Sequence, residues 1–157
     1  MTLRFHSGQV DDLRLKSVVI AVEDLYQNLQ SQLQQTGQNC KACGNCCDFE
    51  SFGHKLYITT PELLYFKTKL QENHIPALSM TAGVCPYRKD GKCSVYPWRF
   101  AGCRIFNCSG DADLQSELSE DIIIRCKALC TQFGLAYRYV DLKSGLEEIQ
   151  SDRKVFL

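Results

Sequence analysis

The sequence predicts a small single domain of the α+β class over residues 1–157, mainly helical, with short strands, a hairpin and cysteine-rich, metal-organised loops. Two long stretches repeat apolar residues at three- and four-residue steps, the period of an amphipathic helix. Between them lie short alternating segments, turn signals and most of the ten cysteines. We therefore divide the chain into an N-terminal helix (12–36), a cysteine-cluster metal-binding core (40–108) and a C-terminal helix and strand (113–157).

The first expected element is a helix over residues 12–36. Its apolar residues form a single stripe, which predicts one buried face. Gly37 is a natural stop for this helix. The opposite face is rich in Gln and Ser, so we assign the helix a packing role. The stripe consists of Leu15, Val18, Val19, Val22, Leu25, Tyr26, Leu29 and Leu33.

A short strand and a helix are expected after the first group of cysteines. Residues 55–59, KLYIT, have the composition of a strand. Residues 59–74 have a helical start, in which Thr60 is the expected N-cap and Pro61 the first helical residue. Glu62 then suits the positive end of the helix.

A hairpin is expected over residues 84–98, because Asp90-Gly91 is a strong signal for a tight turn. Cys85 would lie on one arm of the hairpin and Cys93 on the other. The following stretch, 99–110, is expected to be irregular or a short helix.

The C-terminal part predicts a helix over about 118–133, capped by Ser116 or Ser119 and ended by Gly134. Residues 135–142, LAYRYVDL, alternate enough for a strand. The last segment, 143–154, is expected to be a polar tail or a final short helix.

Charge and hydropathy exclude several partners. Lys+Arg and Asp+Glu are balanced at 18 each, so no global charge draws the chain to nucleic acid or to an anionic membrane. The longest apolar run, VVIAV at 18–22, is too short to span a bilayer. The N-terminal residues hold no long apolar segment after their positive charges, so we expect no secretory signal and a cytoplasmic location.

Ten cysteines are unusual for a cytoplasmic chain of this length. Disulfides are disfavoured in a reducing compartment, so a cysteine framework there indicates metal or redox chemistry. A disulfide framework remains the alternative if the compartment is oxidising.

The stretch CKACGNCC, 40–47, has the spacing C-x2-C-x2-C-C. A tight turn in C-x2-C brings two sulfurs to one point, and a third cysteine at the same step matches the opening of bacterial ferredoxin motifs. Gly44 fits a backbone that wraps a metal and needs a positive φ. Cys47 is the additional thiol. Since neighbouring side chains tend to point apart, we expect Cys46 and Cys47 to face different ways and to serve two sites.

Later cysteines are needed to complete the ligand set. Cys85 is followed by Pro86, a pairing found at iron–sulfur ligands. Eight thiols make two sets of four, the ligand count of two zinc sites or two [4Fe-4S] clusters, and one multinuclear site is also possible. The predicted metal ligands are Cys40, Cys43, Cys46, Cys47, Cys85, Cys93, Cys103 and Cys108.

Several cations flank these cysteines. A four-thiolate site has a net charge of about −2 on either metal, and we expect Arg99 and Arg104 to bind the cofactor by offsetting it. Lys41, Arg88 and Lys92 could do the same, or be solvated surface residues. His54 follows the cluster closely, and could be a ligand, a proton donor or a surface residue.

Cys126 and Cys130 are a different pair, at positions i and i+4 of the expected C-terminal helix. Free cysteine is among the most buried residue types, which favours core packing. A redox pair or ligands to a second site are the alternatives.

The cysteine pattern resembles the YkgJ-type cysteine-cluster family, described as a zinc- or iron-chelating domain. The resemblance rests on CKACGNCC (40–47), CP (85–86) and CSVYPWRFAGCRIFNC (93–108), less than half of the chain. Phe100 stands where that family usually has proline, which bears on loop shape more than on ligation. The resemblance implies metal chelation and no particular reaction.

Three functions are compatible with these features. The first is an iron–sulfur protein that transfers electrons or assists a partner enzyme, so a protein partner is expected. The second is a structural zinc protein whose four-cysteine sites fix an interaction module. The third is a methylase-like or redox enzyme, because a related cysteine motif occurs in flagellin lysine methylases. No catalytic residue is assigned.

Overall fold

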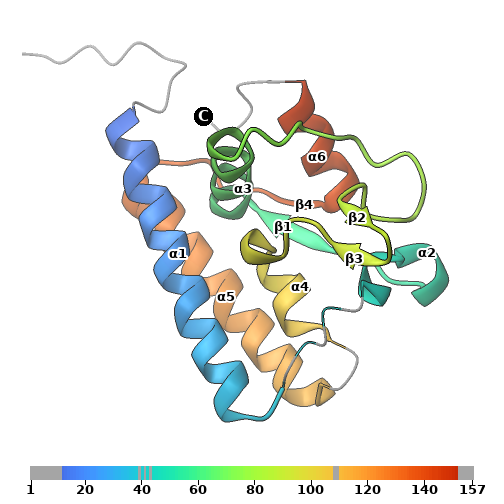
Figure 1. Cartoon of the computed structure of the whole chain (residues 1–157). Helices are drawn as coiled ribbons and strands as arrows, with labels where there is room; N and C mark the ends of the chain where they lie inside the picture. Colours follow the sequence, from blue (N-terminus) through green and yellow to red (C-terminus); the bar gives the residue numbers. More distant parts are fainter. Residues whose placement is uncertain (1–11, 39, 41, 43, 108–109, 152–157) are drawn as a thin grey trace, which may run out of the picture.

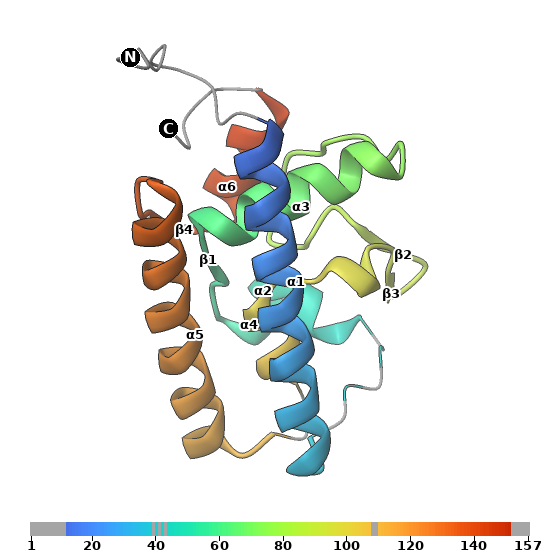
Figure 2. The same cartoon turned by 90° about the vertical axis from the view of Figure 1, so that its left-hand side faces the viewer.

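The computed structural model describes residues 12–38, 40, 42, 44–107 and 110–151. It confirms a small, mainly helical α+β domain with two antiparallel strand pairs. Three helices form its body: α1 (Asp12–Gln35), α3 (Thr60–Glu72) and α5 (Ala112–Phe133). Helices α1 and α5 run side by side in opposite directions, and α3 crosses both near one end (Figures 1 and 2).

The other elements are short and lie mostly on one side of this helical body (Figure 1). Strands β1 and β4 pair antiparallel with Ile58 opposite Val140, and β2 and β3 form a separate hairpin. The short elements are the 3-10 helix η1 (Asn45–Cys47), α2 (Phe49–Phe52), β1 (Tyr57–Thr59), β2 (Arg88–Lys89), β3 (Lys92–Cys93), the 3-10 helix η2 (Tyr96–Trp98), α4 (Ala101–Ile105), β4 (Tyr139–Asp141) and α6 (Leu142–Gln150).

The hydrophobic core confirms the predicted apolar stripe of α1. Seven of its eight residues are buried, and Leu15 packs partly buried against them. The same core receives the inner faces of α3 and α5, where Phe66 and Ile122 are buried. Burial of these side chains is the main stabilising term of the helical body.

The start of α3 differs from the prediction by one residue. Thr59 is the N-cap, and its backbone N–H and hydroxyl both donate to the Glu62 carboxylate at 2.9 Å. Thr60, the residue we expected to cap the helix, instead donates to the Ala136 carbonyl and accepts from the Arg138 N–H. Its hydroxyl therefore ties α3 to the segment that leads into β4.

The hairpin is confirmed at Asp90-Gly91. Both residues have positive φ, 50° and 74°, which suits the tight turn that joins β2 to β3. Cys93 lies at the end of β3, opposite Arg88, while Cys85 precedes β2. The hairpin therefore brings the two cysteines to the same side of the molecule.

The C-terminal helix begins earlier than predicted. Helix α5 starts at Ala112, with Asp111 as its N-cap accepting from the Leu114 N–H at 2.9 Å, so neither Ser116 nor Ser119 caps it. Its predicted end at Gly134 is confirmed. The expected strand over 135–142 shortens to β4, and the final segment forms α6. No helix in the described ranges is both long and apolar enough to cross a membrane.

Candidate metal centre

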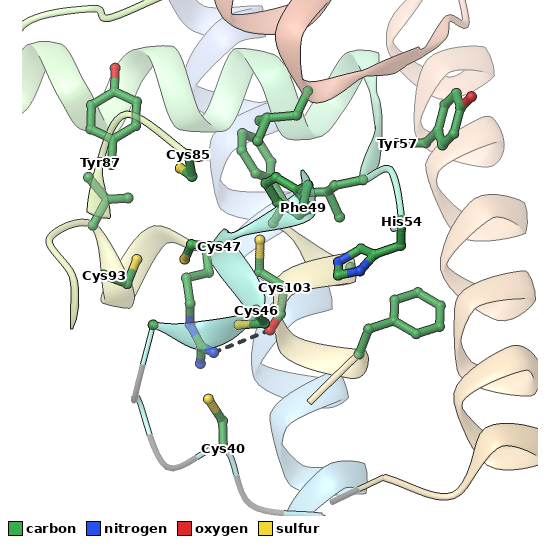
Figure 3. A pocket seen from close by; sticks show the side chains of 18 of the residues that line it. Cys40, Cys46, Cys47, Phe49, His54, Tyr57, Cys85, Tyr87, Cys93 and Cys103 are labelled. Carbon is green, nitrogen blue, oxygen red and sulfur yellow. Dashed lines mark hydrogen bonds between the residues drawn. The ribbon is translucent and has the colours of Figure 1, made fainter. Parts of the chain in front are cut away.

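A cavity of about 230 Å³ lies between η1, the β2–β3 hairpin and α4. Figure 3 shows cysteine sulfurs on several sides of it. Two predicted ligands, Cys43 and Cys108, fall outside the described residues. The other six predicted ligands all line this one cavity: Cys40, Cys46, Cys47, Cys85, Cys93 and Cys103.

Backbone pairing holds the first and second groups of cysteines together. The Cys85 N–H donates to the Cys47 carbonyl at 2.8 Å, and Asp48 and Val84 form an isolated antiparallel bridge. The Glu50 N–H donates to the carbonyl of Gly83, the residue before Val84. Segments that are far apart in the sequence are thus joined by main-chain hydrogen bonds next to the cavity.

Gly44 lets the cysteine loop approach the hairpin turn. Its φ is 71°, as the motif predicted, and a Cβ at this position would lie 2.2 Å from the Gly91 carbonyl oxygen. That contact is impossible for any side chain, because backbone cannot move aside cheaply. The glycine therefore fixes the distance between the C-x2-C-x2-C-C loop and the hairpin that carries Cys93.

Cys47 is at the centre of the thiol contacts. Its thiol shares the cavity with those of Cys46, Cys85 and Cys93, the three thiols that act most strongly on its pKa. We expected Cys46 and Cys47 to face different ways and to serve two sites. Both thiols line the same cavity, and their service of two sites stays a prediction. The 3-10 turn of η1 removes the alternation of side chains on which the expectation depended.

The thiols of the cavity differ in their pKa values. The hydrogen bond from Cys47 lowers the pKa of Cys46 to about 6 and that of Cys93 to about 7, and it also lowers the pKa of Cys85. The pKa of Cys47 itself is raised, chiefly by its hydrogen bond to Cys46. A thiol carries one proton, so the Cys47 S–H serves one neighbour at a time. The cluster therefore favours a thiolate beside one retained proton.

Cys40 and Cys103 close two further sides. The Cys40 sulfur accepts from the Ala42 N–H at 3.3 Å. Cys103 lies on α4, where burial raises its pKa. In Figure 3 its sulfur points into the space between Cys46 and Phe49.

The two predicted arginines have different places. Arg99 lines the cavity, with its guanidinium 3.6 Å from the centre of the Tyr96 ring and donating to the Tyr96 and Cys103 carbonyls. After the hydrogen bond from Cys47, its charge is a further cause that lowers the pKa of Cys46 and of Cys93.

Arg104 is buried and is not among the residues that line the cavity. It lies over the Tyr26 ring at 4.5 Å and donates to the Arg99 and Pro97 carbonyls. Arg104 therefore supports the loop that carries Arg99.

The wall opposite Cys85 and Cys93 is aromatic. Figure 3 shows Phe49 and His54 on that side, and their rings meet edge to face with centroids 5.1 Å apart. Tyr57 and Tyr139 also line the cavity. Their ring centroids lie 5.2 Å apart across the β1–β4 pair. Sequence reasoning missed both tyrosines, since they are far apart in the chain and neither lies near a cysteine motif.

Cys126 and Cys130 are buried in the hydrophobic core, with 0% and 2% of their surface exposed. Burial raises the pKa of both thiols, and neither lines the cavity. None of the described cysteines forms a disulfide. Core packing, the first of the three interpretations of this pair, is the one their position supports.

The donor set fits a metal in its chemistry but is not closed around one point. Within the described ranges, no group of three or more His, Cys, Asp and Glu side chains is already arranged to hold an ion. A thiophilic metal nevertheless suits the site, because six thiols, a backbone N–H donor to sulfur and a buried arginine surround one cavity.

Comparisons with family models, with curated proteins and with solved structures gave no match.

Proposed function

We propose that this chain holds an iron–sulfur or polynuclear iron centre in the cysteine-lined cavity, for electron transfer or as an accessory to a partner enzyme. One observation carries the proposal: six predicted ligands, drawn from separate segments of the chain, line a single cavity of about 230 Å³. A lone zinc ion needs four ligands at about 2.3 Å. Six thiols around an extended space suit a polynuclear centre better.

The surroundings of the sulfurs support the same proposal. Thiolates are the form that binds metal, and the pKa values of three of these thiols are lowered by their neighbours. Hydrogen bonds to sulfur and nearby charge are known to tune cluster potentials, and Ala42 and Arg99 supply one of each. Because such ligands must stay reduced, the proposal includes a cytoplasmic location.

Structural zinc is the second candidate. Its supporting observation is that the cysteines lie on very short elements, including strands of two residues, which a metal could stabilise by crosslinking. Under either candidate, the resemblance to the YkgJ-type family becomes a proposal of chelation. A redox or accessory protein partner belongs to the iron–sulfur candidate.

Metal and sulfide analysis of protein purified without oxygen tests the proposal. An iron–sulfur protein is expected to be brown and to contain both iron and acid-labile sulfide. A colourless protein that contains zinc and no sulfide would overturn the iron–sulfur assignment and favour the zinc candidate. Protein that takes up neither metal after reconstitution would overturn chelation itself.

Cysteine variants locate the centre. Cys46→Ser is expected to lose most of the metal, because serine is a poor ligand for thiophilic metals. The matched control is Cys130→Ser, which removes a thiol outside the cavity. Equal metal content in both variants would contradict the assignment of the cavity.

A further inference from the structure

Glu62 is a buried acid that the proposed function does not use. Only 2% of its surface is exposed, although the sequence suggested an ordinary helix-start residue. Burial of a carboxylate is costly unless hydrogen bonds compensate it. The contacts of its two oxygens therefore decide what this residue does.

The carboxylate accepts four hydrogen bonds from three parts of the molecule. One oxygen accepts from the Tyr26 hydroxyl on α1 at 3.1 Å and from the Ala101 N–H at 2.9 Å. The other accepts both bonds from Thr59. An ionised carboxylate has about four acceptor positions and no donor, so four incoming hydrogen bonds satisfy it.

The bond to Ala101 reaches the site. Ala101 is the first residue of α4, and its N–H is one of the groups that a helix leaves without an internal partner. Glu62 supplies that partner from α3. Cys103 follows Ala101 within α4, so the position of this sulfur depends on where α4 begins.

Tyr26 connects Glu62 to the two arginines. Arg104 lies over the face of the Tyr26 ring and donates to the Arg99 carbonyl. Glu62 thus belongs to the same buried network as Arg104, to which Tyr26 connects it. Arg99 is left as the buried cation that lines the cavity.

We propose that Glu62 is a positioning residue of the cysteine-lined cavity, which fixes Cys103 through the Ala101 N–H and supports Arg99 through Tyr26 and Arg104. The part of this inference that concerns a bound metal rests on the proposed function. The part that concerns α4 does not, so the two can fail separately.

Hydrogen exchange of the full-length protein as purified tests the α4 part. In Glu62→Gln, the side-chain size is kept but the charge is lost, and an amide NH2 can face a donor. Exchange of the amides of residues 101–106 is expected to accelerate about tenfold, the factor for loss of one charge-assisted hydrogen bond. The hairpin over 88–93 is expected to change by less than about twofold.

Tyr26→Phe is the matched control. It removes the other donor to the same carboxylate oxygen and leaves the Ala101 bond in place. Exchange of the Ala101 amide is expected to accelerate less in Tyr26→Phe than in Glu62→Gln, because the bond from Ala101 to Glu62 remains. If Glu62→Gln does not fold, Ala101→Pro tests the same hydrogen bond. Proline is tolerated at the first helical position, and Phe100 before it is already extended. That variant deletes the N–H and leaves Glu62 intact.

The outcomes separate a positioning role from a general one. Unchanged α4 exchange in both Glu62→Gln and Ala101→Pro would overturn the proposal. So would acceleration spread evenly over α1, α3 and α5. In folded protein that contains a centre, Glu62→Gln is also expected to alter its absorption spectrum, whereas Cys130→Ala is not. Protein that contains no metal would refute the proposed function while the exchange result still stood.

Discussion

Cysteine has two different environments in this molecule. Cys126 and Cys130 lie between apolar side chains of the helical body, where they are buried and their pKa values are raised. The six cysteines of the cavity lie beside one another, beside backbone N–H groups and beside Arg99. The same side chain is an inert core residue in one region and a candidate ligand in the other, and the difference lies in the neighbours.

The two regions also differ in what stabilises them. Helices α1, α3 and α5 bury continuous apolar faces against one another. The cysteine-lined region has strands of two residues, two 3-10 turns and an α4 of five residues. Such short elements are not stable alone. Under the proposed function, a bound metal would crosslink these short elements, a stabilisation that the helical body does not need.

Removal of the metal is expected to give the largest difference between the regions. A structural thiolate site can contribute on the order of 10 kcal/mol to folding. After chelation, amides over 84–107 are expected to lose protection against hydrogen exchange while α1 and α5 keep theirs. Far-UV circular dichroism should retain most of the helical signal. Simultaneous unfolding of both regions would show that they are one cooperative unit.

Leu29→Ala should act on the helical body alone. Leu29 is 1% exposed in the core, and truncation of a buried leucine costs about 2–5 kcal/mol of unfolding free energy. Urea denaturation should show this loss, with no change in metal content per folded molecule. Loss of metal in proportion to stability would mean that the cavity depends on the packing of α1.

Arg99→Gln should act on the cavity region alone. Loss of the positive charge favours the less negative, oxidised form of an iron–sulfur centre, so its reduction potential is expected to fall. A change of about 1 kcal/mol corresponds to a shift on the order of 40 mV for one electron. Protein-film voltammetry measures this shift. Lys92→Gln, at an exposed hairpin position, is the control and should shift the potential much less, because solvent screens its charge.

The pH dependence of thiol labelling should show the smallest difference. The lowered pKa values of Cys46 and Cys93, about 6 and about 7, mean that the fold favours their thiolates. This contribution is present above the ordinary thiol pKa and is lost as pH falls through about 7 to about 6. In metal-stripped protein that remains folded, alkylation of both should decline over that range, while Cys130 stays unlabelled. Labelling that declines only near the ordinary thiol pKa, in protein whose amides over 84–107 remain protected, would contradict the contacts with Cys47.

Local features of the fold were predictable from local sequence. The stripe of α1, the Asp90-Gly91 turn and the positive φ of Gly44 each depend on a few neighbouring residues. The start of α5 was misplaced because Asp111 caps it, and two serines within the helix carry the same signal. Thr60 was misplaced by one residue because its hydroxyl bonds to a distant segment that leads into β4.

The sequence by itself determined that this chain has a helical body and a cysteine loop of metal-ligand spacing, because periodicity and short spacings are local properties of the chain. Only the tertiary structure decided that Cys47 shares one cavity with five other cysteines, that Arg99 lines this cavity while Arg104 does not, and that Glu62 is buried. Those relations depend on which distant segments pack together. Packing is decided by burial over the whole domain, and no single motif encodes it.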